Sequence, residues 1–142
     1  MGGSYGGYAA MRGVTRDGER FRCAISINGV SDLVKLNQYD RAFLFGKRST
    51  AWLKKRAYDF AAVSPIHDAA KASTPMLVIY GKKDLRVPVD QSRDFANALE
   101  KAGKSVRYVE LPKADHGLTR WEDRQSTLTE VEAFLAKYNP AN

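Results

Sequence analysis

Cysteine and histidine are scarce in this 142-residue chain, which has one cysteine, Cys23, and two histidines. A lone cysteine forms no intrachain disulfide, and its position in the apolar run FRCAISI favours a small buried core residue. So few Cys and His residues support a zinc site poorly, because structural zinc takes four such ligands. The glycine-rich start GGSYGG also lacks the Lys-Ser/Thr ending of a phosphate-binding loop. We therefore expect no disulfide, no metal ion and no other cofactor.

Long apolar runs are also missing. No stretch approaches the roughly 20 apolar residues that a membrane-spanning helix needs. The first residues, MGGSYGG, lack the basic and apolar segments of a signal peptide. These absences predict a cytoplasmic protein with no membrane partner. The composition, with 44% hydrophobic and 27% charged residues, is typical of a globular protein, and the length predicts a single domain over residues 1–142.

Acidic residues are outnumbered, with 16 Asp and Glu against 23 Lys and Arg, which gives a formal net charge of +7. A basic excess can indicate nucleic-acid binding. The basic residues are scattered, however, and only LKKR at positions 53–56 forms a short cluster. Aromatic residues do not alternate with basic ones as they do in proteins that bind single strands. We therefore expect a solvated basic surface and no nucleic-acid partner.

Apolar runs and amphipathic stretches alternate along the chain. The runs in FRCAISING, MLVIY and SVRYVELP predict three buried strands. Amphipathic spacing predicts helices over 5–15, 90–103 and 121–138, and in the last of these Leu128, Val131, Leu135 and Tyr138 form one apolar stripe. Strands that alternate with helices indicate a parallel sheet with right-handed crossovers. The predicted class is α/β, with a small, mostly parallel three-stranded sheet flanked by helices.

Two loops that follow predicted strands carry polar residues suited to catalysis. Asp84 lies in KKDLRVP after the second strand, and His116 lies in KADHGL after the third. Ser4 lies in GGSYGG, a turn of the kind that joins a strand to a helix. Because ligands of open parallel sheets gather at the carboxyl ends of the strands, we expect all three residues at one edge.

The segment at 2–6, GGSYG, fits the pattern G-x-S-x-G, which holds the nucleophile of α/β-hydrolases. In that fold the catalytic residues follow the chain order Ser, Asp, His, as they do here. The predicted nucleophile is Ser4, whose hydroxyl proton passes to His116. Asp84 orients the imidazole and stabilises its charged form.

Two other residues compete for these roles. Asp115 could replace Asp84 as the acid, but it is adjacent to His116, and neighbouring residues rarely bend back to pair. His67 lies in SPIHDAA before a strand, at the opposite end of the sheet, which favours a surface histidine. The expected triad is therefore Ser4, Asp84 and His116.

The segments GGSYGGY, GKKDLRVPVDQS and VELPKADHG resemble the catalytic domain of the prolyl oligopeptidase family, in particular its acylaminoacyl-peptidase and dipeptidyl-aminopeptidase branches. The resemblance extends over residues 2–134 and implies an α/β-hydrolase fold. It implies the same roles for Ser4, Asp84 and His116. It also implies that the backbone N–H of Tyr5 lies in the oxyanion hole.

The sequence departs from the family pattern at its start. Family members carry several strands before the nucleophile, and usually a β-propeller before those, whereas this chain begins at the nucleophile turn. We therefore expect a partial α/β-hydrolase fold in which Ser4 is held from one side and a second oxyanion donor is missing. The loss of one donor costs about 10²–10³ in turnover. The strand near Phe21 to Ile27 would have an uncovered apolar edge, so we expect a homo-oligomer that covers it.

The chemistry expected from these residues is that of a serine hydrolase with an acyl-enzyme intermediate. Small acyl esters need less positioning than peptides, so carboxyl esters are the favoured substrates. One alternative is a serine peptidase of prolyl oligopeptidase type that releases N-terminal residues from short peptides. Another alternative is a catalytically inactive folded fragment that acts as an interaction module. The expected binding partner is thus a small ester or a short peptide.

Overall fold

The computed structural model describes residues 1–42 and 59–141. These residues form a parallel sheet with the strand order β1-β2-β3-β4. The strands are β1 (Gly2–Gly3), β2 (Ala24–Ile27), β3 (Met76–Gly81) and β4 (Val106–Leu111). The predicted α/β class is confirmed, but the predicted count of three strands is wrong, because β1 adds a fourth. A strand of two glycines has no apolar side chain and so leaves no hydrophobic signal in the sequence.

β1 places Ser4 directly after a strand. Gly2 lies opposite Ser26 and Gly3 opposite Ile27, and the Ser4 N–H donates a hydrogen bond to the Ile27 carbonyl oxygen at 2.9 Å. The edge that was expected to be uncovered is therefore paired at the last two residues of β2. The homo-oligomer that would cover the rest of this edge stays a prediction, which sedimentation equilibrium can test.

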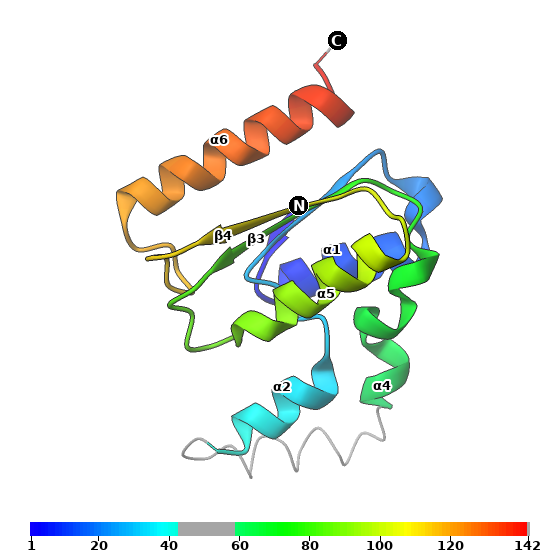
Figure 1. Ribbon diagram of the computed structural model, residues 1–142, viewed down its shortest axis with the longest axis vertical. Coiled ribbons are helices and arrows are strands. Elements are labelled where there is room, and N and C mark those ends of the chain that lie inside the picture. Colours follow the sequence, from blue (N-terminus) through cyan, green and yellow to red (C-terminus); the bar gives the residue numbers. More distant parts are fainter. Residues whose placement is uncertain (43–58, 142) are drawn as a thin grey trace.

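Helices lie on both faces of the sheet. Figure 1 shows α6 on one face and α1 and α5 on the other, with α2 and α4 beyond them. Their bounds are α1 (Tyr5–Arg16), α2 (Leu33–Asp40), α4 (Phe60–Val63), α5 (Val89–Lys101) and α6 (Trp121–Tyr138), and two short 3₁₀ helices are η1 (Gly18–Arg20) and η2 (Pro65–Lys71). Asp32 begins α2 by accepting a hydrogen bond from the Lys35 N–H at 2.9 Å, which is a typical N-terminal cap.

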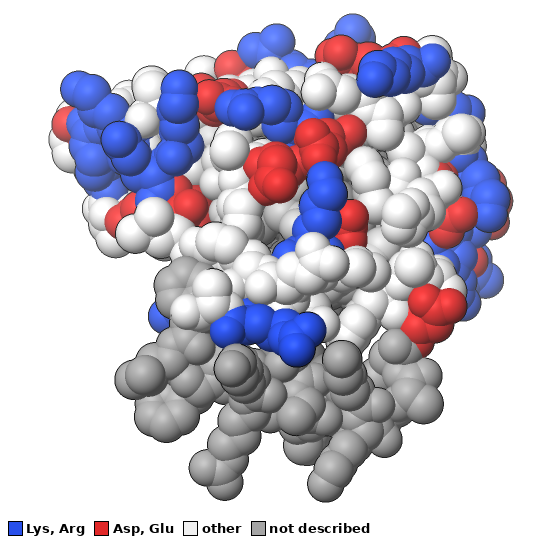
Figure 2. All heavy atoms as spheres, turned by 60° about the horizontal axis from the view of Figure 1, so that its bottom comes forward, with Lys and Arg blue, Asp and Glu red and all other residues white. Residues whose placement is uncertain are grey.

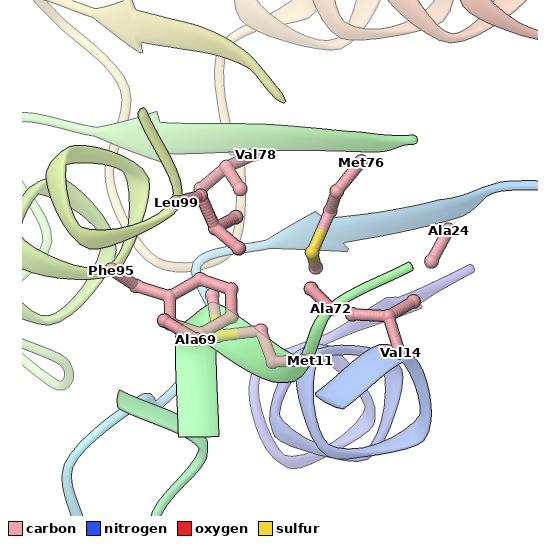
Figure 3. Close-up of a cluster of buried hydrophobic side chains, with 9 residues drawn as sticks. All are labelled: Met11, Val14, Ala24, Ala69, Ala72, Met76, Val78, Phe95 and Leu99. Atoms are coloured by element: carbon pink, nitrogen blue, oxygen red, sulfur yellow. The ribbon is translucent and has the colours of Figure 1, made fainter. Parts of the chain in front are cut away.

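The core has two halves, one on each face of the sheet. The central strand β3 is buried throughout, and its side chains alternate between the halves. One half, drawn in Figure 3, contains Met11, Val14, Ala24, Ala69, Ala72, Met76, Val78, Phe95 and Leu99. The other contains Ile25, Leu77, Ile79, Leu111, Ala114, Val131 and Phe134, and the half-buried Cys23 packs against it. Burial on both faces explains why MLVIY is a continuous apolar run.

The buried face of α6 differs from the predicted stripe. Leu128 is 66% exposed, whereas Asp123, Thr127 and Phe134 are buried together with Val131. Thr127 satisfies its hydroxyl by donating a hydrogen bond to the carbonyl oxygen of Asp123 at 2.8 Å. Polar residues thus occupy the first half of the buried face of α6, so the spacing of apolar residues does not indicate this part of the face.

Charged side chains are mixed on the face of the molecule drawn in Figure 2, where Lys and Arg form several separate groups with Asp and Glu among them. The described basic residues are therefore not gathered into one patch on that face, and the LKKR cluster at 53–56 lies outside the described residues. None of the helices in residues 1–42 and 59–141 combines the length and the apolar character that crossing a membrane requires.

Candidate active site

Ser4 lies in the tight turn between β1 and α1. Its backbone has φ 54° and ψ −119°, an unfavourable conformation for a residue with a side chain. The turn is tight enough that a Cβ on Gly2 would collide with the carbonyl of Gly6, and a Cβ on Gly7 would lie 2.6 Å from the Gly29 Cα. These glycines therefore allow α1 to pack against β1 and against the chain after β2, and so fix the position of Ser4.

Asp84 is held by the loop that follows β3. One carboxylate oxygen, Oδ1, accepts hydrogen bonds from the N–H groups of Arg86 at 2.7 Å and Val87 at 2.9 Å. The Tyr80 hydroxyl braces the same loop by donating to the Val87 carbonyl oxygen at 2.9 Å. The Asp84 side chain is fully buried, and its other oxygen, Oδ2, faces His116.

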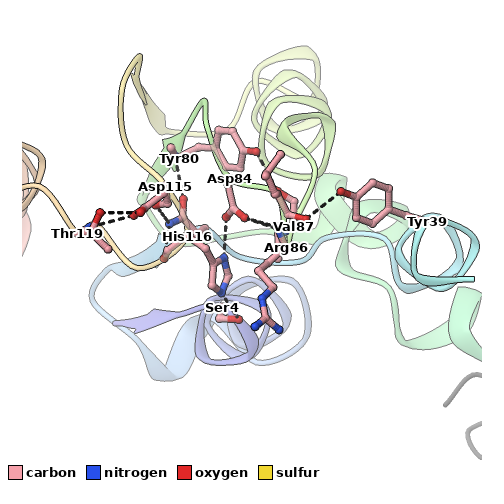
Figure 4. A network of polar contacts seen from close by, with 12 residues as sticks. Ser4, Tyr39, Tyr80, Asp84, Arg86, Val87, Asp115, His116 and Thr119 are labelled. Carbon is pink, nitrogen blue, oxygen red and sulfur yellow. Dashed lines mark hydrogen bonds and ion pairs between the residues drawn. The ribbon is translucent and has the colours of Figure 1, made fainter. Parts of the chain in front are cut away.

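His116 connects Asp84 with Ser4 (Figure 4). Its Nδ1 lies 2.7 Å from Asp84 Oδ2, and its Nε2 lies 3.0 Å from Ser4 Oγ. The three residues follow β1, β3 and β4, so they come from the carboxyl ends of three strands, as expected. An imidazole with its proton on Nδ1 donates to the carboxylate and leaves Nε2 free to accept the proton of the serine hydroxyl.

The two competing residues are used elsewhere. Both carboxylate oxygens of Asp115 accept hydrogen bonds from Thr119, one from its N–H at 2.9 Å and one from its hydroxyl at 2.6 Å. These hydrogen bonds hold the pKa of Asp115 below its usual value. His67 is exposed in η2, which precedes β3 and so lies toward the amino end of that strand. The structure brings neither residue to Ser4.

Asn28 supports the site and was missed in the sequence. It is buried just after β2 with φ 50°, and its Oδ1 accepts a hydrogen bond from the Gly81 N–H at 2.8 Å. Its Nδ2 donates to the His116 carbonyl oxygen at 3.0 Å. Asn28 therefore ties the end of β3 to the loop that carries His116. Asn28 ends the apolar run FRCAISING together with Gly29, so it has the same place after a strand as the other site residues.

Tyr5 is the first residue of α1, so its N–H has no acceptor within the helix. The N-terminal end of a helix favours negative charge, which suits an oxyanion beside Ser4. Tyr5 is 74% exposed, and its ring centroid lies 5.3 Å from that of Tyr8. The backbone of Tyr5 is thus placed beside the serine while its ring forms part of the surface.

A cavity of about 290 Å³ opens beside Ser4 and His116. Its apolar wall consists of Val30, Leu33, Leu36 and Val87, and its charged residues are Asp40 and Arg86. The Tyr39 hydroxyl donates to the Leu85 carbonyl oxygen at 2.9 Å, which ties α2 to the loop of Asp84. A cavity of about 600 Å³ lies instead between β4 and α6, and neither Ser4 nor His116 lines it. The smaller cavity is therefore the one that a substrate of Ser4 would enter.

A sequence model of the prolyl oligopeptidase family matches residues 1–140. The chain belongs to this family. Dipeptidyl peptidase family member 6 of Caenorhabditis elegans is 31% identical over 95% of the chain and 19% of its own length. Dipeptidyl aminopeptidase BIII of Pseudoxanthomonas mexicana is 32% identical over 96% of the chain and 21% of its own length. The chain thus spans about a fifth of the length of each of these two relatives.

Comparison with solved structures agrees with this family assignment. A puromycin-hydrolysing peptidase of Mycobacterium tuberculosis superposes with a TM-score of 0.83 at 27% identity, over 96% of this chain and 21% of that one. An esterase of Thermogutta terrifontis superposes with a TM-score of 0.72 at 28% identity, over 98% of this chain and 54% of that one. The chain therefore has part of the α/β-hydrolase fold, and its likeness extends to both a peptidase and an esterase.

Proposed function

We propose that this chain carries the nucleophile, the base and the acid of a serine hydrolase that cleaves carboxyl esters through an acyl-enzyme intermediate. The observation that carries the proposal is the chain of hydrogen bonds from Ser4 Oγ to His116 Nε2 at 3.0 Å and from His116 Nδ1 to Asp84 Oδ2 at 2.7 Å. Family membership supports the same chemistry, because α/β-hydrolases place these residue types in this chain order.

The reaction begins when His116 Nε2 accepts the hydroxyl proton of Ser4 and Oγ attacks the carbonyl carbon. The protonated imidazole is stabilised by Asp84, whose Oδ1 is already engaged by two backbone N–H groups and whose Oδ2 remains for Nδ1–H. His116 then gives its proton to the leaving oxygen, and the acyl group stays on Ser4. A water molecule, deprotonated by the same imidazole, releases the acid and restores the serine.

Negative charge develops on the carbonyl oxygen during both attacks. The N–H of Tyr5 is suited to bind it, because this group has no acceptor within α1 and lies at the positive end of the helix dipole. A single backbone donor of this kind is worth about 10²–10³ in turnover. We assign Tyr5 this role as the oxyanion donor.

Peptide bonds are the second candidate substrate. The likeness to a dipeptidyl aminopeptidase, at 32% identity, favours a peptidase, and the likeness to an esterase structure, at 28% identity, favours esters. Amides have poorer leaving groups than activated esters and need proton donation to the leaving nitrogen. We therefore expect activated esters to be cleaved faster than p-nitroanilides of the same acyl group by the same three residues.

The test compares the wild-type chain with Ser4→Ala on p-nitrophenyl butyrate. We expect a burst of p-nitrophenol and covalent labelling of Ser4 by a fluorophosphonate, both abolished by the substitution, with turnover lowered by about 10³ or more. Ser73→Ala is the matched control, because Ser73 is exposed and precedes β3 at the other end of the sheet. Equal turnover by Ser4→Ala would remove Ser4 from the mechanism. A wild-type chain that melts cooperatively but is not labelled would favour the inactive interaction module.

A further inference from the structure

The cavity beside Ser4 contains two oppositely charged side chains that are not paired with each other. Asp40, the last residue of α2, and Arg86, from the loop of Asp84, both line it. Among the hydrogen bonds and ion pairs of the described residues, none engages the carboxylate of Asp40, although its surroundings are partly buried. Within the part of the chain that the structure describes, this carboxylate therefore lies at the substrate cavity with no counter-ion.

Burial without a counter-ion is unfavourable for a carboxylate. Loss of solvent raises the pKa of Asp40 above its usual value, and no cation in residues 1–42 or 59–141 offsets the effect. A bound ammonium or guanidinium group would supply the missing charge and form charge-assisted hydrogen bonds. The neighbouring Leu33 and Leu36 offer apolar surface to the aliphatic part of such a ligand.

The other ionisable groups in the cavity are Arg86, His116 and Tyr5. Figure 4 shows the Arg86 side chain extending from the loop of Asp84 to the side of Ser4. A cation would therefore be repelled near the serine and attracted toward the end of α2. This separation fits a substrate whose reacting carbonyl is at Ser4 and whose positive charge points away from it.

We propose that Asp40 is a specificity-determining residue and that the favoured substrates carry a cationic group on the acyl side of the bond that is cleaved. The cation is either an α-ammonium or the side chain of lysine or arginine. A cavity of about 290 Å³ lies at the small end of the range of ligand pockets, which suits a small substrate. The inference rests on the proposed function for its meaning in catalysis, but cation binding at Asp40 can be measured without turnover.

The first experiment measures binding to the Ser4→Ala chain by NMR titration. Three ligands are compared: Nα-acetyl-lysine amide, norleucine amide with a free α-ammonium, and the neutral Nα-acetyl-norleucine amide. At least one cationic ligand should bind about tenfold tighter than the neutral one, and the one that does identifies the source of the charge. A neutral ligand that binds as tightly as both cationic ligands would overturn the proposal.

Substitutions then test whether Asp40 causes the preference for cationic ligands. Asp40→Asn should remove the preference for the cation, whereas Asp40→Glu should retain most of it. Asp17→Asn is the matched control for charge, because Asp17 follows the far end of α1, about 18 Å along the helix axis from Ser4. A preference that persists in Asp40→Asn, or that disappears equally in Asp17→Asn, would contradict the assignment. Thermal melts of the variants check that all of them are folded.

The second experiment measures turnover of the corresponding p-nitrophenyl esters. The ratio of kcat/KM for the cationic ester to that for the neutral ester should fall about tenfold in Asp40→Asn. If the wild-type chain and Ser4→Ala hydrolyse both esters equally, the proposed function fails, and the binding data still decide the role of Asp40. If Ser4 is essential but the wild-type ratio is one or less, the specificity proposal fails and the hydrolase remains.

Discussion

The two sides of the candidate site are held in place by different means. Asp84 and His116 are positioned by hydrogen bonds, from the backbone of the Asp84 loop and from the Asn28 side chain. Apart from the hydrogen bond of its N–H to Ile27, Ser4 is positioned by steric fit, between a two-residue strand and a helix that packs through glycines, with its own backbone at φ 54°. Added atoms should therefore damage the nucleophile side, and removed hydrogen bonds should damage the acid–base side.

The largest effect should come from Gly7→Ala on the nucleophile side. The new Cβ would lie 2.6 Å from the Gly29 Cα and 2.7 Å from Ser26 Oγ. We expect the free energy of unfolding to fall by about 1–3 kcal/mol and kcat/KM to fall by about 10², because α1 must shift and take Ser4 with it. Thermal or urea unfolding and the p-nitrophenyl butyrate assay measure the two effects.

Gly6→Ala is the control within the same turn. A Cβ at Gly6 would meet no atom within 4 Å, and alanine favours a helix by up to about 1 kcal/mol over glycine. We therefore expect unchanged or higher stability, although Gly6 occupies the last position of the G-x-S-x-G pattern. Equal damage from the two substitutions would show that the steric explanation is wrong.

The next effect should come from Asn28→Ala on the acid–base side. The substitution leaves the Gly81 N–H and the His116 carbonyl without partners and puts alanine at φ 50°. The Gly81 N–H is buried, and a buried polar group left unsatisfied costs about 1–3 kcal/mol, so the unfolding free energy should fall by that order. The rate of acylation should fall about tenfold as the His116 loop loses its anchor. Stopped-flow measurement of the burst rate separates this effect from changes in deacylation.

Asn28→Asp separates the two hydrogen bonds of that side chain. The carboxylate still accepts from the Gly81 N–H but no longer donates to the His116 carbonyl. We expect a variant whose acylation rate is lowered as in Asn28→Ala. If this variant acylates at the wild-type rate, Asn28 supports the site only through its hydrogen bond to the Gly81 N–H at the end of β3.

Tyr80→Phe should have a smaller effect on the same side. It removes the hydroxyl that donates to the Val87 carbonyl oxygen, which costs about 0.5–1.5 kcal/mol of unfolding free energy. The two backbone N–H groups still hold Asp84 Oδ1, so kcat/KM should change by less than about threefold. A loss of kcat/KM as large as that of Asn28→Ala would mean that the backbone alone does not hold the acid.

The same comparison explains how much of the site could be predicted from the sequence. Asp84 and His116 follow long apolar strands, so their places could be derived from hydrophobic patterns, and Ser4 carries a glycine motif. β1 and Asn28 could not be found in this way, because two glycines carry no apolar signal and Asn-Gly is usual in turns. Asp40 lies on a helix whose place beside Ser4 depends on tertiary contacts. Such contacts leave no local pattern in the sequence.

The smallest effect should come from Asp68→Asn, which tests a polar contact on the nucleophile side. Asp68 of η2 pairs with Arg12 of α1 and with Lys71, and its hydrogen bonds to Lys71 and Arg12 hold its pKa below the usual value. A lowered pKa stabilises the folded chain above the ordinary pKa of about 4, and this contribution is lost as the pH falls through the lowered value. Since the pair is partly exposed, we expect Asp68→Asn to cost about 0.5–1 kcal/mol at pH 7.

The pH dependence distinguishes this ion pair from a packing effect. The difference in unfolding free energy between the wild-type chain and Asp68→Asn should shrink as the pH falls below 4, and 1 M NaCl should reduce it at pH 7. Asp94→Asn is the control, because Asp94 of α5 pairs with Lys35 of α2, and neither partner belongs to α1. If Asp68→Asn lowers kcat/KM far more than stability, the ion pair holds α1 in register for Ser4, and the nucleophile side depends on charge as well as on steric fit.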